Sequence, residues 1–190
     1  MRLWVIQIGT VNRSRVYSFV GSSPPIAPQY IIMSKFTFFW NNRTPFSNWY
    51  PSVFIWNGIR FTRGEQYMMF RKAMLFGEWD IADQILATDN PAKQKDLGRE
   101  VKNYDDDKWA AVRFDIMVEG LYEKFNQNPQ LKKALLDTEG TELVEANPND
   151  RIWGIGLTEN DPRALSKETW LGQNLLGKVL DEVRRRLGEA

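Results

Sequence analysis

The chain has 190 residues, and its 25 Lys and Arg almost balance its 24 Asp and Glu, giving a net charge of +1. This balance does not favour a nucleic-acid or membrane surface as a partner. The chain contains neither cysteine nor histidine, which excludes disulfides, Ser-His and Cys-His catalytic pairs and the usual zinc sites.

Acid–base chemistry in this chain must therefore use Asp, Glu, Lys, Tyr or water. We expect no metal and no cofactor. No apolar run reaches the about 20 residues of a membrane span, and the N-terminal stretch lacks the pattern of a signal peptide. We expect a cytoplasmic protein with no membrane partner.

The N-terminal stretch differs from the rest of the chain. Residues 1–32 contain a loop-like patch at 21–28, rich in serine and proline, and periodic structure begins only after Met33. We interpret residues 1–32 as a leader or extension and residues 33–190 as one domain, with Met33 as a natural start. The alternative is an extra strand at 3–8 that packs on the core.

The first periodic elements of the domain are short strands. Residues 36–40 read as a strand, and residues 46–52 follow as an aromatic and polar loop. The runs 53–56 and 59–61 flank Asn57-Gly58, the strongest local signal for a β-hairpin. A helix at 64–76 comes next, with Thr62 as a possible cap and Gly77 as its stop.

Helices dominate the remainder of the chain. Asp105, Asp106 and Asp107 are typical of a helix N-terminus, where acids match the helix dipole. One strand is expected at 142–146, followed by a loop and an irregular, glycine-containing stretch at 151–157. The expected helices are 79–87, 90–101, 108–126, 129–136 and 174–187. This order predicts an α+β fold: a compact, mostly helical domain with a few short strands, including the hairpin.

Two ionisable residues stand out in the helix at 64–76. Glu65 and Lys72 are seven positions apart, nearly two turns, so their side chains point the same way. Met68 and Met69 lie between them. A Glu and a Lys on a helix are usually a solvated face, but an ionisable group against an apolar wall can have a perturbed pKa.

Three other polar groups lie among aromatics and glycines. They are Asn48 and Tyr50 in the loop at 46–52, the run 150–154, and the run 170–174. Each has a structural alternative, since Asp150 can be a turn residue and Asn174 a helix cap.

The order and combination of these runs resemble the NADAR family of YbiA-like N-glycosidases over roughly residues 36–187. The runs are Phe46-Ser47-Asn48-Trp49-Tyr50-Pro51-Ser52, Gly64-Glu65-Gln66-Tyr67 with Lys72, Gly98-Arg99, Lys124-Phe125-Asn126-Gln127-Asn128-Pro129, Asp150-Arg151-Ile152-Trp153-Gly154-Ile155-Gly156 and Trp170-Leu171-Gly172-Gln173-Asn174. The resemblance implies a compact, mostly helical α+β fold. It also implies cleavage of N-glycosidic bonds of ribose, in phosphoribosylated riboflavin-pathway intermediates or in ADP-ribose attached to nucleic-acid bases.

The resemblance also implies roles for individual residues. Active-site positions fall on Glu65, Lys72, Asp150 and Trp153, and pocket-lining positions on Asn48, Tyr50 and Asn174. We further expect Arg43, Arg99 and Arg151 to bind the substrate. This chain departs from the family where a His often follows the Glu, because it has Gln66, and where Gln-Ala often precedes the Lys, because it has Phe70-Arg71.

The residue types fit this chemistry. Breaking a ribose C1–N bond builds positive charge at C1, which Glu65 or Asp150 can stabilise while activating water. Lys72 can protonate the leaving group, hold a phosphate or form a Schiff base, and Trp153 or Tyr50 can stack on the base. The rival functions are a non-catalytic module that binds ADP-ribose or a nucleotide, and an interaction protein whose aromatics form only the core.

Overall fold

The computed structural model describes residues 7–11, 14–18 and 35–189. The chain divides into two units, residues 1–33 and 34–190. In the first unit, strands β1 (Gln7–Val11) and β2 (Ser14–Ser18) pair antiparallel. The expected loop at 21–28, Met33 and most of the alternative strand at 3–8 lie outside the described residues. The interpretation of residues 1–32 as a dispensable leader stays a prediction.

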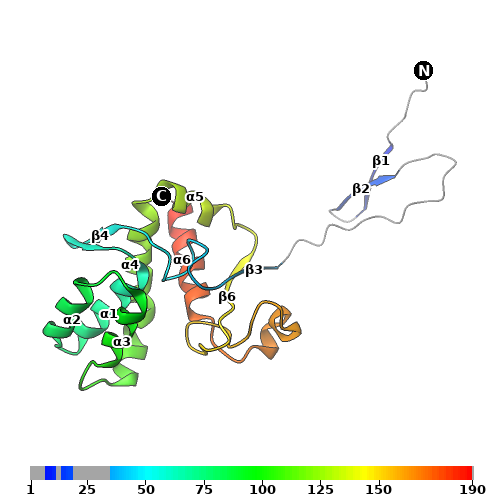
Figure 1. Ribbon diagram of the computed structural model, residues 1–190. Helices are drawn as coiled ribbons and strands as arrows, with labels where there is room; N and C mark the ends of the chain where they lie inside the picture. Colours follow the sequence, from blue (N-terminus) through cyan, green and yellow to red (C-terminus); the bar gives the residue numbers. More distant parts are fainter. Residues whose placement is uncertain (1–6, 12–13, 19–34, 190) are drawn as a thin grey trace. The chain divides into compact units, whose positions relative to one another are not determined.

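The second unit has the α+β architecture that the sequence predicts. Short strands alternate with longer helices, and two 3₁₀ turns, which the sequence does not predict, lie before the last helix (Figure 1). Within the described residues, no helix is long and apolar enough to cross a membrane. The elements are β3 (Phe36–Phe39), β4 (Phe54–Trp56), β5 (Ile59–Phe61), α1 (Gly64–Leu75), α2 (Trp79–Leu86), α3 (Pro91–Arg99), α4 (Asp106–Asn126), α5 (Pro129–Leu136), β6 (Glu142–Glu145), η1 (Pro162–Leu165), η2 (Lys167–Thr169) and α6 (Leu175–Glu189).

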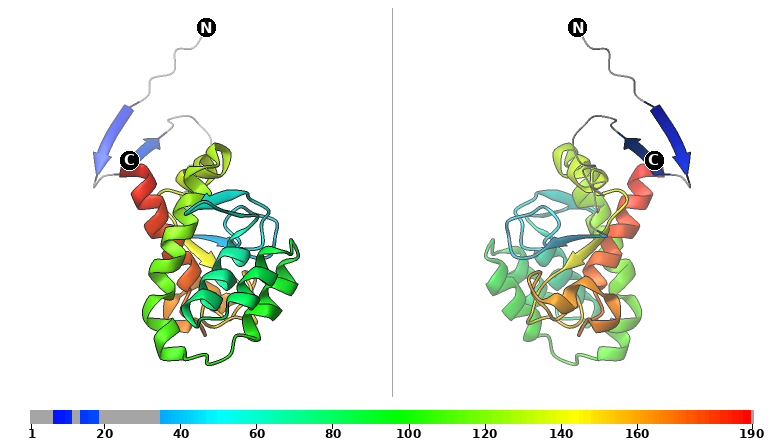
Figure 2. Two further views of the ribbon diagram at one scale, coloured as in Figure 1. Left: turned by 90° about the vertical axis from the view of Figure 1, so that its left-hand side faces the viewer. Right: turned by 90° about the vertical axis from the view of Figure 1, so that its right-hand side faces the viewer.

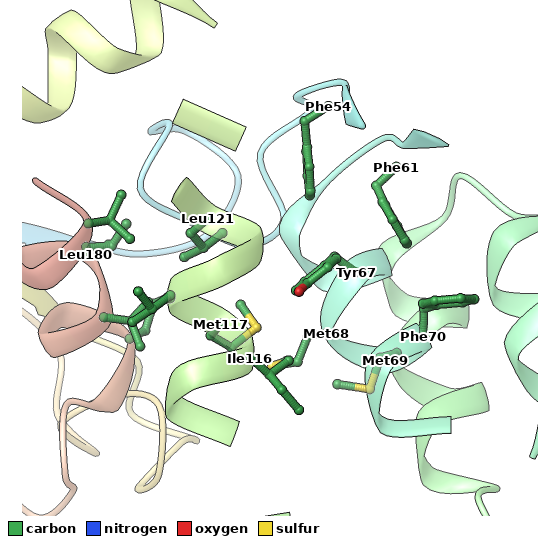
Figure 3. Close-up of a cluster of buried hydrophobic side chains, with 14 of the residues drawn as sticks. Phe54, Phe61, Tyr67, Met68, Met69, Phe70, Ile116, Met117, Leu121 and Leu180 are labelled. Carbon is green, nitrogen blue, oxygen red and sulfur yellow. The ribbon is translucent and has the colours of Figure 1, made fainter. Parts of the chain in front are cut away.

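The long helix α4 lies between α1 and α6, and these three helices hold the main core. Figure 3 shows side chains of α4 between those of α1 on one side and α6 on the other. Helices α2 and α3 pack on α1, as the two views of Figure 2 also show. The core residues labelled in Figure 3 are Phe54, Phe61, Tyr67, Met68, Met69, Phe70, Ile116, Met117, Leu121 and Leu180. This core makes α1 a rigid platform for the residues on its first turns.

Strands β3 and β6 form a parallel pair although helices α1 to α5 separate them in the chain. The register places Phe36 opposite Glu142 and Phe39 opposite Glu145. Helix α6 packs against β6. A second, smaller core lies beside this pair, built from Val144, Ile155, Leu157 and Ala164. The pairing brings the end of β6 and the loop after it into the same domain interior as α1.

The hairpin of β4 and β5 is formed as predicted. Asn57 and Gly58 have φ values of 48° and 78°, the left-handed values of a type I′ turn. The expectation that Thr62 caps α1 is wrong. The N-cap residue is Arg63, which makes no side-chain cap hydrogen bond. The Thr62 hydroxyl and main-chain N–H both donate to Gln66 Oε1 instead, so this hydroxyl does not accept from the helix.

Candidate active site

A small cavity of about 130 Å³ lies where the 47–49 segment, α1, α3 and the chain from β6 to Trp153 meet. It contains three carboxyl groups and one ammonium group. The lining residues are Ser47, Asn48, Trp49, Glu65, Met68, Met69, Lys95, Glu145, Asn147, Asp150 and Trp153. Four of the ten predicted site residues therefore come together here: Asn48, Glu65, Asp150 and Trp153.

Glu65 is the buried acid that α1 presents to this cavity. Its main-chain N–H donates to the Asn48 carbonyl at 2.9 Å, which joins the first turn of α1 to the 47–49 segment. The side chain is 3% exposed, and its Oε1 has no hydrogen-bond partner among the described residues. Burial raises the pKa of Glu65 to about 7, against the lowering effects of Lys95 and of a hydrogen bond with Trp49. Glu65 is thus not a charge on a solvated helix face.

Glu145 is a second buried acid in the cavity, at the end of β6. Its side chain is 7% exposed, and its Oε2 also has no hydrogen-bond partner in the described part of the chain. Burial raises the pKa of Glu145 to about 8; the nearby Asp150 and Glu65 carboxylates add to this rise, and Lys95 opposes it. The sequence analysis missed Glu145. Its only signal was its place near the end of the strand predicted at 142–146, shortly before the loop that carries Asp150.

Asp150 and Trp153 reach the cavity through a tight turn. Asp150 Oδ1 accepts hydrogen bonds from the main-chain N–H groups of Ile152, at 2.9 Å, and Trp153, at 2.8 Å. Asp150 is therefore a turn residue and a cavity residue at once. A Cβ atom at Gly154 would lie 2.9 Å from the Glu145 carbonyl oxygen, so only glycine lets the turn approach β6 this closely.

A buried lysine, Lys124, binds the main chain of the segment that carries Asn48. Lys124 is completely buried, and its Nζ donates to the carbonyls of Pro45, at 2.7 Å, and Ser47, at 3.0 Å. Burial lowers the pKa of Lys124 to about 7. In front, Asn48 Oδ1 is buried without a hydrogen-bond partner among the described residues. It lies so near α1 that a Cβ at Gly64 would be 2.6 Å away.

Lys72 is on the same side of α1 as Glu65 but does not line the cavity. Its Nζ donates to the Gly98 carbonyl at 2.8 Å and lies 4.2 Å from the centre of the Tyr104 ring. Burial lowers the pKa of Lys72, and nearby Arg99 lowers it further. The cation that does line the cavity is Lys95 of α3. Nothing in the sequence distinguished Lys95 from other polar residues of that helix.

Asn174 is completely buried behind the cavity and does not line it. Its Oδ1 accepts from the Glu145 N–H at 3.0 Å, and its Nδ2 donates to the Leu143 carbonyl at 2.9 Å. Its main-chain carbonyl accepts the first hydrogen bond of α6, from Lys178. Asn174 therefore fixes the strand that ends in Glu145.

The other predicted binding residues lie outside the cavity lining. Tyr50 borders a separate open groove of about 710 Å³, and Arg43 borders another of about 400 Å³. Arg99 is exposed and pairs with Asp96 at 3.0 Å. Arg151 is exposed as well, and its carbonyl accepts from the Gln173 N–H.

Gln66, where the chain departs from the family pattern, does not line the cavity. Gln66 is 1% exposed, and its Nε2 donates to the carbonyls of Ile85 and Thr88 at 3.0 and 3.2 Å. The side chain thus ties the start of α1 to the end of α2.

Residues 38–188 match the NADAR domain. Protein irg-1 of Caenorhabditis elegans is 40% identical over 168 residues, covering 80% of this chain and 79% of that protein. N-glycosidase R617 of Acanthamoeba polyphaga mimivirus is 44% identical over 144 residues, covering 73% of this chain and 85% of that protein. The NMR structure of the E. coli protein YbiA is similar, with a TM-score of 0.68 and 25% identity over 85% of this chain and 89% of that one. The chain belongs to the NADAR domain family.

Proposed function

We propose that this protein is an N-glycosidase that hydrolyses the bond between ribose C1 and a base nitrogen. The observation that carries the proposal is Glu65: a buried carboxyl with an unpartnered oxygen, in a cavity that it shares with Asn48 and Trp153. The names of relatives support it, since the mimiviral relative and E. coli YbiA are named N-glycosidases. Relatives from Vibrio vulnificus and Arabidopsis thaliana are named riboflavin biosynthesis proteins.

The size of the cavity favours a sugar as the buried part of the substrate. Its volume of about 130 Å³ is below the roughly 300–1,000 Å³ of sites that enclose drug-sized ligands. A ribose ring can enter while the base and the phosphate stay at the mouth. The unpartnered oxygens of Glu65, Glu145 and Asn48 are acceptors, and sugar hydroxyls are the donors that would satisfy them.

Glu65 has the ionisation that a base at this site needs. As C1–N cleavage builds positive charge at C1, the Glu65 carboxylate stabilises that charge and takes a proton from the attacking water. A pKa of about 7 leaves a large share of the carboxyl ionised at neutral pH, while keeping it basic enough to accept the proton.

Cations near the cavity suit a phosphorylated sugar. Lys95 lines the cavity, and Arg99 is close enough to influence the pKa values of both Glu65 and Lys72. We assign Lys95, Arg99 and Lys72 to the phosphate of the substrate and the Trp153 ring to the base. Phosphoribosyl and ADP-ribosyl substrates, including ADP-ribosylated nucleic acid, share this chemistry.

A substrate panel read by mass spectrometry tests the proposal. The panel contains a 5-phosphoribosylated aminopyrimidine, an oligonucleotide with ADP-ribose on a base, and the unphosphorylated riboside. We expect release of free base from one of the first two, and slower release from the riboside. Ligand binding without any released base would instead show a binding module.

A further inference from the structure

The cavity holds a second buried acid, Glu145, to which the proposed function gives no part in proton transfer. Hydrolysis of an N-glycoside needs two proton movements, one from the attacking water and one to the departing base nitrogen. Glu65 accounts for the first. The second needs an acid that still holds its proton at neutral pH and faces the bond that breaks.

The other candidate acids are engaged or lie elsewhere. The Lys72 ammonium group is bound to the Gly98 carbonyl outside the cavity lining. Asp150 uses Oδ1 to accept from two main-chain N–H groups, so this oxygen is engaged in the turn. Lys95 is the cation that lowers the pKa of both Glu65 and Glu145, and its place in the site is with the substrate phosphate.

Glu145 is held firmly at its backbone and is free at its carboxyl. The Glu145 N–H donates to Asn174, and its carbonyl accepts from the Ile155 N–H at 3.0 Å. Glu145 also lies opposite Phe39 in the parallel pair of β6 and β3. Its Oε2 is buried with no partner among the described residues. Such a group is fixed in place and lacks only the ligand that would complete its hydrogen bonds.

We propose that Glu145 is the general acid of the reaction. As the C1–N bond breaks, its electron pair goes to the base nitrogen, which takes the proton from Glu145. Water forms the new C1–O bond and gives a proton to the Glu65 carboxylate. Glu145 ends ionised and Glu65 protonated, and proton exchange with solvent restores both. This assignment rests on the proposed N-glycosidase function.

The charges around Glu145 agree with this role. Asp150 from its own loop and Glu65 from α1 face it as carboxylates, and Lys95 from α3 faces it as a cation. Burial with these neighbours places the pKa of Glu145 near 8 and that of Glu65 near 7. The neighbouring Asp150 and Glu65 carboxyl groups both favour the protonated form of Glu145, which a general acid needs.

A comparison of two leaving groups tests the assignment. The substrates are the 5-phosphoribosylated aminopyrimidine, whose nitrogen must be protonated to leave, and 4-nitrophenyl riboside 5-phosphate, whose nitrophenolate leaves without a proton. We expect Glu145→Gln to lower kcat by about 10²-fold or more with the first substrate and far less with the second. Glu65→Gln, the matched control, should impair both. Equal losses on both substrates, or no loss on either, would overturn the role of Glu145.

The pH profile supplies a second readout. Wild-type kcat/KM should rise with pH near 7, as Glu65 ionises, and fall near pH 8, as Glu145 loses its proton, following the pKa values of the two residues. In Glu145→Gln the alkaline limb should disappear; if it persists, the acid is another group. If the Gln variant does not fold, Glu145→Asp is the alternative because it keeps an acid at this position. It should retain the alkaline limb of the pH profile with a lower kcat. A wild-type protein that cleaves neither substrate would instead refute the proposed function.

Discussion

Glu65 and Gln66 are neighbours on the first turn of α1, are almost equally buried, and differ in one respect. Both ends of the Gln66 amide have hydrogen-bond partners. Its Oε1 accepts from Thr62, and its Nε2 donates to the carbonyls of Ile85, Leu86 and Thr88. Glu65 has an oxygen with no partner among the described residues. Burial is therefore common to a structural and a functional polar residue, and hydrogen-bond satisfaction distinguishes them.

The same contrast holds for four other buried residues. Lys124 and Asn174 are completely buried and make hydrogen bonds to main-chain groups. Asn48 and Glu145 line the cavity, and each has a buried oxygen with no partner among the described residues. A buried polar atom without a partner costs about 1–3 kcal/mol, so a cluster of three around one cavity indicates a site completed by ligand.

The largest effect is expected at Glu65. Glu65→Gln keeps the shape and removes the charge, so kcat should fall by about 10²- to 10⁴-fold while substrate binding survives. Steady-state kinetics and calorimetric titration measure the two quantities. Glu100→Gln, at an exposed position, is the matched control and should keep the wild-type rate. A Glu65→Gln variant as fast as the wild type would mean that the active site lies elsewhere.

Gln66→Leu should have the opposite pattern. It leaves the Thr62 N–H and the Ile85 carbonyl without their side-chain partner, so the free energy of unfolding should fall by about 2 kcal/mol or more. The kcat of the folded protein should stay within about threefold of wild type, because such a change acts on stability. Urea unfolding and kinetics at low temperature check both. A large loss of rate at unchanged stability would remove the distinction between the two neighbours.

Lys124→Met tests a buried lysine whose hydrogen bonds to main-chain carbonyls support the site. Loss of the bonds to Pro45 and Ser47 should lower the free energy of unfolding by about 1–3 kcal/mol and raise KM, because these bonds hold the segment of Asn48. The folded-state pKa of about 7 lies below the ordinary value of about 10.4. The contribution of Lys124 to stability therefore grows as pH rises from about 7 to about 10. The difference in the free energy of unfolding between the wild type and the variant should therefore grow over the same pH range. A difference that does not change with pH would contradict this prediction.

Lys72→Met should affect binding more than rate. Because the ammonium group lies outside the cavity lining, we expect KM to rise by about tenfold, roughly 1.4 kcal/mol, with kcat nearly unchanged. Borohydride trapping with substrate provides the control. A covalent adduct on the wild type that disappears in the variant, together with loss of kcat, would show that Lys72 acts as a Schiff-base nucleophile.

The smallest effect is expected from removal of residues 1–32. A chain that starts at Met33 should keep the melting temperature and kcat of the full chain. Residues 38–188 match the NADAR domain, and this range contains the residues that Glu65 and Gln66 contact. Calorimetry and the substrate assay measure both. A fall of many degrees would show that the N-terminal stretch packs on the domain.

The sequence by itself determined the local elements and four residues of the cavity. The Asn57-Gly58 turn, the helix after it and the Asp105 cap follow from backbone preferences within a few residues, and the structure has them. The sequence left the burial of Glu65 open, and its sign of burial was Met68 and Met69 one turn further along the same helix. Asp150 and Trp153 could be paired because one turn holds both.

Tertiary structure decided the rest of the site. The parallel pairing of β3 with β6 joins segments about a hundred residues apart, and no local pattern encodes such a pairing. Strand β6 brings Glu145 to the cavity, and Asn174 supports that strand through the Glu145 N–H. The packing of α3 on α1 brings Lys95 to the cavity where Lys72 was expected. Spacing along a helix gives the side on which a residue lies. Whether that side meets a cavity or a neighbouring helix depends on packing, which the whole chain determines together.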